Sequence, residues 1–286
     1  MPVLSHYQTS SKFFLTLELF QSKRYSPDMS SVLRYSWARQ IVKSPYIDLF
    51  GALLIFGVCI ARDFHGTIYH QGEIQFGIPF LELGSHMQEG AFPLGVFSMI
   101  GAIFSVLATR LVGKQNNWGN FIAILTTISS GAIDYMFGNH SAIITYPVTF
   151  AIHNFAFTNW KKGVKIRKRD IWYYLIFAGG IAIGFALVYL GAYLFGGRTD
   201  SYFLSLVSVI FGISLGANFC NALKYEETYG NWIVYNIVQL AKNLTQLNIS
   251  NVVKYVFYLF NAVITLVDWK FNGDMNKDKN QKVVVA

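Results

Sequence analysis

The sequence predicts an all-α membrane protein in which two parallel three-helix bundles are joined by a linker helix (a 3+1+3 plan), preceded by an extra N-terminal transmembrane helix. Three observations predict this fold class. The composition is apolar and poor in charge, a series of apolar segments is long enough to cross a bilayer, and the later part of the chain contains an approximate internal repeat.

The composition excludes an ordinary soluble protein. Of the 286 residues, 53% are hydrophobic and only 13% are charged, whereas soluble domains contain about 25% charged residues. The net charge is +8, but the basic residues lie between apolar segments, so nucleic acid is not an expected partner. Cys59 and Cys220 lie inside apolar segments and are expected to be small buried hydrophobes. No Cys/His spacing predicts a metal or cofactor.

A helix needs about 20 mostly apolar residues to cross the hydrocarbon region. The first candidate is short and opens near Asp48. The third and seventh are polar, which is typical of helices that face a bundle interior or a wet cavity. The eight candidate spans are 46–61, 92–112, 118–137, 141–160, 171–196, 201–222, 230–247 and 251–269.

These spans divide the chain into predicted segments. Residues 62–91 are expected to form an external loop that includes an interfacial helix, in which His65, His70 and His86 are solvated rather than metal ligands. The complete division is an N-terminal arm (1–45), the extra helix (46–61), the external loop (62–91), the first bundle (92–160), a basic loop with the linker helix (161–196), the second bundle (201–270) and a tail (271–286).

The distribution of Lys and Arg predicts the orientation. Most of the 23 basic residues fall on one side if both termini are cytoplasmic, and the strongest run lies within 161–169. This run is interpreted as a topology determinant that also touches anionic lipid, with partner docking as the alternative. Arg62, Arg198, Lys242 and Lys254 fall at outer helix ends, where they are expected to snorkel.

The internal repeat relates two stretches of the chain. One begins at Asn117-Trp118 and ends at Asn159-Trp160-Lys161, and the other begins at Asn231-Trp232 and ends at Asp268-Trp269-Lys270. Each stretch follows one more apolar span, which gives two three-helix units, as in the SWEET-type transporters that this plan resembles. A parallel repeat of this kind places a solute path between the units, near the middle of the membrane.

Amide and aromatic side chains in these units are the candidate solute ligands. Trp232, Asn236 and Gln239 share one helix face, and Tyr258 and Asn261 share another. The alternative is that buried amides only join helices, at ~0.6–2 kcal/mol each. The full candidate set is Trp232, Asn236, Gln239, Asn261, Asn154, Tyr258, Trp118, Asn218 and Asn221.

Charge inside the spans is scarce, which favours uncoupled transport over an ion-driven pump. Asp134 is expected to form a structural salt bridge with Lys242 or Lys254, and His153 is either a packing histidine or a gate or proton site. The sequence contains no G-x-x-x-x-G-K-[ST] loop, so direct use of ATP is not expected. It also contains no motif of a membrane-embedded hydrolase, so an enzyme is not expected. A non-transporting scaffold remains the alternative.

The chain resembles the PnuC family of vitamin transporters. The resembling stretches are Asn231-Trp232-Ile233-Val234-Tyr235-Asn236, the end of the chain from Tyr258 to Lys270, and the segment from Asn154 to Lys162. The resemblance implies a facilitator for nicotinamide riboside in the bacterial cytoplasmic (inner) membrane, a cytosolic kinase that traps the solute, and a homotrimer. Relatives carry thiamine or riboflavin, so these stay alternative solutes. The resemblance covers about 92–270 and leaves the N-terminal region unassigned.

Overall fold

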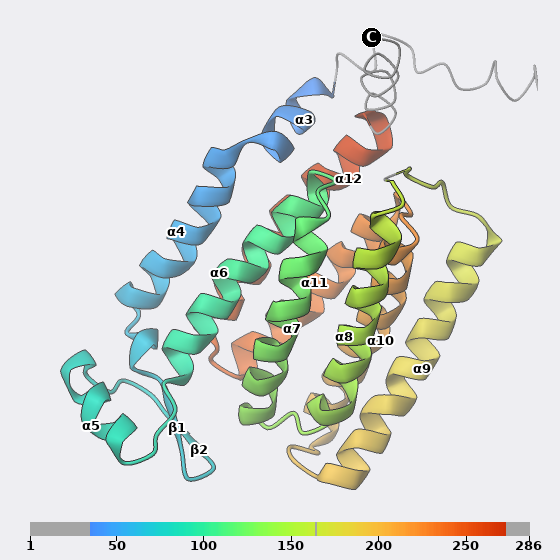
Figure 1. The fold of residues 1–286 in the computed structure, drawn as a ribbon. Coiled ribbons are helices and arrows are strands. Elements are labelled where there is room, and N and C mark those ends of the chain that lie inside the picture. The colour runs from blue at the N-terminus through green and yellow to red at the C-terminus, as the bar shows by residue number, and fades with distance from the viewer. Residues whose placement is uncertain (1–34, 164, 273–286) are drawn as a thin grey trace, which may run out of the picture.

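The computed structural model describes residues 35–163 and 165–272. The remainder of the predicted arm and tail lies outside the described residues. Figure 1 shows a bundle of long helices with one small hairpin at the end opposite to the one where α12 finishes. Its long helices are α4 (Pro45–Ala61), α6 (Leu94–Gly113), α7 (Trp118–Met136), α8 (Ala142–Trp160), α9 (Ile171–Phe195), α10 (Ser201–Ala222), α11 (Thr228–Thr245) and α12 (Ile249–Asn272).

Each predicted span corresponds to one of these helices, but not all of them are equally apolar. Among the described helices, α6, α9, α10 and α12 are long and apolar enough to cross a membrane, and the pair formed by α3 (Ser36–Lys43) and α4, bent by 58°, is a fifth candidate. Helices α7, α8 and α11 have spanning length, at 18 or 19 residues, yet they fall short of that apolarity. These three carry polar side chains into the interior, as described below.

The long helices pack in two trios. Helix α7 lies between α6 and α8, and α11 lies between α10 and α12. The trios meet where α8 packs on α10 and where α12 packs on α6, while α9 covers the outside of α10 and α8. Trp160 and Trp269, at the ends of α8 and α12, have ring centroids 6.2 Å apart. The trios therefore close on each other at the end where α8 and α12 finish.

Close packing of α9 on α10 depends on glycine. A Cβ at Gly180 would lie 2.5 Å from the Cα of Gly216, and a Cβ at Gly184 would lie 2.5 Å from the Cα of Gly212. Small residues four apart on both helices let the two backbones touch, which is a common way to join helices in lipid. This contact fixes α9 to α10 of the second trio.

Residues 62–91 differ from the predicted loop. It contains a two-stranded antiparallel hairpin, β1 (Ile68–His70) and β2 (Glu73–Gln75), in addition to the short helix α5 (Leu83–Gln88). Strands of three residues are too short to show an alternating pattern in sequence, so a loop was the expectation. The turn uses Gln71 and Gly72, both with positive φ, as two-residue hairpins require. Short 3₁₀ turns, η1 (Phe64–Gly66) and η2 (Phe80–Glu82), flank the hairpin.

The predicted N-terminal arm includes helix α3, which packs on the end of α12. Its buried residues Ala38 and Val42 contact Ile264, and Arg39 Nε lies 2.6 Å from Asp268 Oδ1. Arg110 of α6 is buried below the bend between α3 and α4, where it donates to Asp48 Oδ1 at 2.7 Å. The bend is therefore tied to the trios by two arginines.

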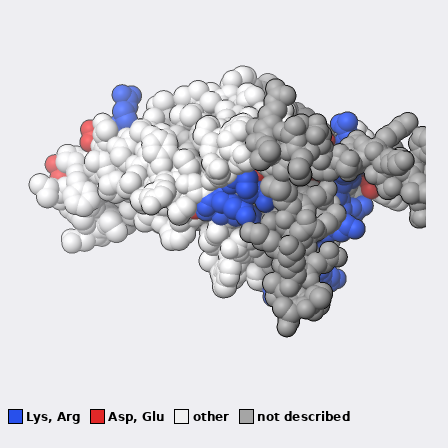
Figure 2. All heavy atoms as spheres, turned by 90° about the horizontal axis from the view of Figure 1, so that it is seen from above, with Lys and Arg blue, Asp and Glu red and all other residues white. Residues whose placement is uncertain are grey.

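Basic residues gather at one end of the bundle. This basic end holds α3, the end of α12 and the loop 161–170, whereas the hairpin lies at the opposite end. Seen from above, Lys and Arg form clusters on an otherwise largely uncharged described surface (Figure 2). Within the loop, Arg167 pairs in a short parallel bridge with Tyr225, which attaches the loop to the turn between α10 and α11.

Candidate functional site: a polar cavity between the two trios

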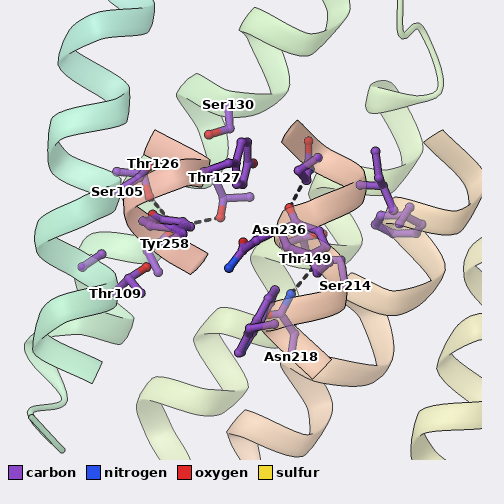
Figure 3. Close-up of a pocket in the computed structure, with 18 of the residues that line it drawn as sticks. Ser105, Thr109, Thr126, Thr127, Ser130, Thr149, Ser214, Asn218, Asn236 and Tyr258 are labelled. Carbon is purple, nitrogen blue, oxygen red and sulfur yellow. Dashed lines mark hydrogen bonds between the residues drawn. The ribbon is translucent and has the colours of Figure 1, made fainter. Parts of the chain in front are cut away.

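A cavity of about 200 Å³ lies between the trios. Its lining comes from α6, α7 and α8 on one side and from α10, α11 and α12 on the other. Figure 3 shows labelled side chains from both sides pointing toward one another, among them Thr127, Thr149 and Asn236. Six helices of a mostly apolar chain thus surround a polar interior, which is a composition expected of a solute site and not of a packed core.

The wall formed by α6, α7 and α8 is rich in hydroxyl groups. Apart from Tyr146, its large side chains are few, so it offers short donors and acceptors over a broad area. This hydroxyl wall consists of Ser105, Thr109, Thr126, Thr127, Ser130, Thr145 and Thr149.

The wall formed by α10, α11 and α12 carries rings and amides. Trp232 and Tyr235 make an edge contact with centroids 5.0 Å apart, and Tyr255 and Tyr258 do so at 5.7 Å. Gln239 Nε2 donates to the Tyr235 hydroxyl at 2.7 Å. This ring wall consists of Tyr229, Trp232, Tyr235, Tyr255 and Tyr258 with the amides Asn218, Asn221, Asn236 and Gln239.

Asn236 offers the cavity an unused acceptor. Its side chain is only 2% exposed, it lines the cavity, and its Oδ1 has no hydrogen-bond partner among the described residues. Leaving a buried polar group unpaired costs about 1–3 kcal/mol. A solute that donates to Asn236 would remove this cost.

An ion pair lies in the cavity wall toward the hairpin end. Lys242 Nζ is 2.6 Å from Asp134 Oδ1, and the other carboxylate oxygen accepts from Asn139 Nδ2 at 3.1 Å and from the Tyr146 hydroxyl at 3.0 Å. The expected salt bridge of Asp134 is therefore confirmed, with Lys242 as the partner. The expectation that Lys242 and Lys254 snorkel is wrong, because they are only 2% and 6% exposed and line the cavity.

Six of the nine predicted solute ligands line the cavity: Trp232, Asn236, Gln239, Tyr258, Asn218 and Asn221. The other three do not. Trp118 is 63% exposed at the start of α7. Asn154 is half-buried and donates to the carbonyl of Phe150 in its own helix at 2.8 Å. Asn261 accepts from Arg110 Nη1 at 2.9 Å and so joins α12 to α6.

The prediction missed the hydroxyl wall and several tyrosines. Thr126, Thr127 and Ser130 made α7 look polar in sequence, but single hydroxyls are common in membrane helices and did not stand out. His153 does line the cavity, and its Nδ1 has no partner among the described residues. In the described part of the chain, no three His, Cys, Asp or Glu side chains lie close enough to hold a metal ion.

Comparisons with known proteins identify a family and a related fold. A family described as "Nicotinamide mononucleotide transporter" matches residues 95–271. The fold is similar to that in the "Crystal structure of the Vitamin B3 transporter PnuC", with a TM-score of 0.52 and 17% identity over 68% of this chain and 92% of that chain. No curated protein sequence matches the chain significantly. The family match covers more than half of the chain, so this multi-pass membrane protein belongs to the nicotinamide mononucleotide transporter family, as the resemblance to PnuC proteins predicted.

Proposed function

We propose that this protein is a carrier that lets a small pyridine nucleoside equilibrate across the membrane, with nicotinamide riboside as the first candidate. Thiamine and riboflavin are the alternative solutes of the same class of transporter. The observation that supports this best is the polar cavity between the two trios, which presents rings and amides on one side and hydroxyl groups on the other. A membrane scaffold has no need of such a cavity.

The 3+1+3 plan is part of this proposal. Helices α6 and α10 end at Gly113 and Ala222, and α7 and α11 end at Met136 and Thr245, so both pairs of ends are 109 positions apart. The same offset relates Asn139 to Asn248, Ser141 to Ser250 and Trp160 to Trp269. Cavity residues follow it too, for example Ser105 with Ser214, Thr127 with Asn236 and Tyr146 with Tyr255. This supports a duplicated unit without gaps, with α9 as the linker.

Reciprocal hydrogen bonds also support the duplication. Trp160 Nε1, in the first trio, donates to the carbonyl of Asn221 in the second at 3.0 Å. Trp269 Nε1, in the second trio, donates to the carbonyl of Gly113 in the first at 2.9 Å. The donors are 109 positions apart and the acceptors 108, so these are two closely similar bonds that cross in opposite directions, as a two-fold relation between the units would produce.

Nicotinamide riboside suits the two walls. Its ring can stack on the aromatic side chains, where a cation over Trp or Tyr gains ~0.5–2 kcal/mol. Its carboxamide can donate to Asn236, and its ribose can bond to the hydroxyl wall, whose members both donate and accept. We therefore keep Trp232, Asn236, Gln239, Tyr258, Asn218 and Asn221 as proposed ligands, and add Thr127 and Thr149 as proposed ribose ligands.

Transport is proposed to be uncoupled, with trapping by a cytosolic kinase. Both carboxylate oxygens of Asp134 are already bonded to Lys242, Asn139 or Tyr146. A carboxylate that is satisfied in this way is a poor proton carrier. The protein is proposed to work as a homotrimer in a bacterial inner membrane with both termini cytoplasmic.

The test is uptake into vesicles that contain the purified protein. We expect radiolabelled nicotinamide riboside to reach equal concentrations inside and outside, and to accumulate only when a nucleoside kinase and ATP are enclosed. Vesicles without protein are the control. The carrier proposal would be refuted if vesicles with and without the protein took up nicotinamide riboside, thiamine and riboflavin equally.

A further inference from the structure

A stripe of polar side chains runs along α12 from the cavity to the basic end. It starts at Tyr258, which lines the cavity, and its members follow at alternating intervals of three and four residues, so they share one helix face. Every member beyond Tyr258 is at most 2% exposed. Polar side chains buried at this density in a membrane helix need partners. This polar stripe consists of Tyr258, Asn261, Thr265, Asp268 and Asn272.

The middle of the polar stripe is only partly satisfied. Thr265 Oγ1 and Asn261 Nδ2 have no hydrogen-bond partner in the described part of the chain, although Asn261 Oδ1 accepts from Arg110. The hydroxyl of Tyr229, a cavity residue, has no described partner either. A Cβ at Gly113 would lie 3.2 Å from Thr265 Oγ1 and 3.6 Å from the Tyr229 hydroxyl, so both oxygens face the same bare backbone. Buried polar atoms are normally paired with protein or water, so a group of unpaired ones is expected where water passes.

The corresponding face of α8 is apolar at these positions. With the proposed offset of 109, Asn261 and Thr265 correspond to Ile152 and Ala156, which are also buried. Ile152 packs in an apolar cluster that includes Phe211 of α10. The trios therefore meet at two joints that the proposed duplication relates, and only the joint between α6 and α12 carries unpaired polar atoms at these positions.

Helix α3 covers the far end of the polar stripe. Arg39 donates to Asp268 Oδ1 at 2.6 Å and to the carbonyl of Asn272. Asn272 Nδ2 in turn donates at 3.1 Å to the carbonyl of Tyr35, which immediately precedes α3. Because α3 and α4 meet at a bend of 58°, α3 turns onto the end of α12 while α4 runs along α6 and α12. Arg39 therefore joins α3 to the last two members of the polar stripe.

We propose that water and the solute pass between the cavity and the basic end along the polar stripe, at the joint between α6 and α12, and that α3 closes this passage through Arg39. This inference rests on the proposed carrier function and adds its inner route. The passage is closed in this structure, since the stripe is buried. When α3 moves away, Asn261 and Thr265 gain water or solute as partners, which offsets part of the cost of opening. The segment that precedes the family match thereby receives a role.

The route is tested by the rate at which a buried thiol reacts with iodoacetamide, a small neutral reagent. In protein with Cys59 and Cys220 replaced by serine, Thr265→Cys places a thiol on the polar stripe. Ala156→Cys places one at the corresponding, equally buried position of α8 and is the matched control. We expect Thr265→Cys to react about tenfold faster, because the unpaired polar atoms lower the cost of opening one joint and not the other. Equal rates, or a faster reaction of Ala156→Cys, would overturn the route.

The role of α3 is tested by adding Arg39→Met to both cysteine variants. Thr265→Cys should then react about tenfold faster again, as for the loss of one charge-assisted hydrogen bond, and Ala156→Cys should be unchanged. Lys43→Met removes the same charge from an exposed position of α3 and should have no effect. An unchanged rate of Thr265→Cys after Arg39→Met would overturn the role of α3.

Uptake into vesicles gives a second measurement if Thr265→Cys does not fold. Arg39→Met should equilibrate nicotinamide riboside faster than Lys43→Met does, because its inner passage opens more readily. Equal or slower equilibration would overturn the proposal. The thiol rates need no solute, so they separate this inference from the carrier function, which the absence of uptake of any solute by the wild type would overturn.

Discussion

At the scale of single residues, two tryptophans can be compared, one in the cavity and one on the surface. Trp232 lines the cavity, whereas Trp118 is 63% exposed at a helix start. We expect Trp232→Ala to reduce nicotinamide riboside uptake about tenfold, because ring contacts contribute ~0.5–2 kcal/mol. Trp118→Ala, which removes the same ring from outside the cavity, is the control and should leave uptake unchanged. Equal effects of the two substitutions would contradict the proposed site.

Asp134 and Lys242 form a buried ion pair. We expect that removing one of the two charges destabilises the protein more than removing both. Asp134→Asn leaves the Lys242 ammonium without its carboxylate, which costs roughly 3–5 kcal/mol when a buried pair is broken. The double variant Asp134→Asn with Lys242→Met removes both charges and should recover part of that loss. Free energies of unfolding in detergent can measure this. A double variant that is less stable than Asp134→Asn would argue against the pairing.

At the scale of elements, the close contact between α9 and α10 depends on glycines, which have no side chain to hold the helices apart. Gly184→Ala would place a methyl group 2.5 Å from the Cα of Gly212, so the helices must separate. We expect a loss of about 1–3 kcal/mol in the free energy of unfolding, as for other overpacked sites. Gly179→Ala on the same helix is the matched control, because nothing lies within 4 Å of its added methyl group. Its stability should equal or exceed that of the wild type.

The start of α9 should respond to acid. Asp170 Oδ1 accepts from the Tyr225 hydroxyl at 2.8 Å and from the backbone N–H of Tyr173 at 3.0 Å. The bond from Tyr225, followed by that N–H and by Arg167, lowers the pKa of Asp170. A lowered pKa means that the stabilisation is present above the usual Asp value, ~3.9, and is lost as pH falls through the lowered value.

The melting temperature of the wild type should therefore decline on acidification more steeply than that of Asp170→Asn. Asp170→Asn should also melt below the wild type at neutral pH. Tyr225→Phe removes the main donor and should bring the acid response closer to that of Asp170→Asn. Parallel pH profiles for the wild type and Asp170→Asn would show that this carboxylate is not linked to folding.

At the scale of the whole molecule, the charge distribution predicts orientation. The basic end should be cytoplasmic and the hairpin end external. In a variant with Cys59 and Cys220 replaced by serine, Glu73→Cys should react with an impermeant maleimide in intact cells, because Glu73 is exposed on the hairpin. Lys162→Cys, exposed at the basic end, should react only after permeabilisation. The reverse pattern would invert the proposed topology.

The sequence predicted where the helices lie along the chain better than it predicted which face of each helix is buried. The helices lie where the apolar segments predicted them, because spanning length and hydropathy are local properties of the chain. The sequence interpretation of the repeat matched Trp118 with Trp232. With the proposed offset of 109 positions, Trp232 corresponds instead to Ala123, and both of these residues line the cavity. Helices α9 and α10 each carry two glycines four apart, a signal for close packing that the prediction did not use.

By itself, the sequence determined that the chain is a helical membrane protein of a recognisable family, with polar helices that need a polar interior. Only the tertiary structure decided which side chains face that interior. In a bilayer, lipid and protein core are both apolar, so the apolar pattern of a helix does not fix its rotation. Asn236, turned into the cavity, and Asn261, bonded to Arg110, are the same residue type on neighbouring helices, and only the packing of the trios distinguishes them.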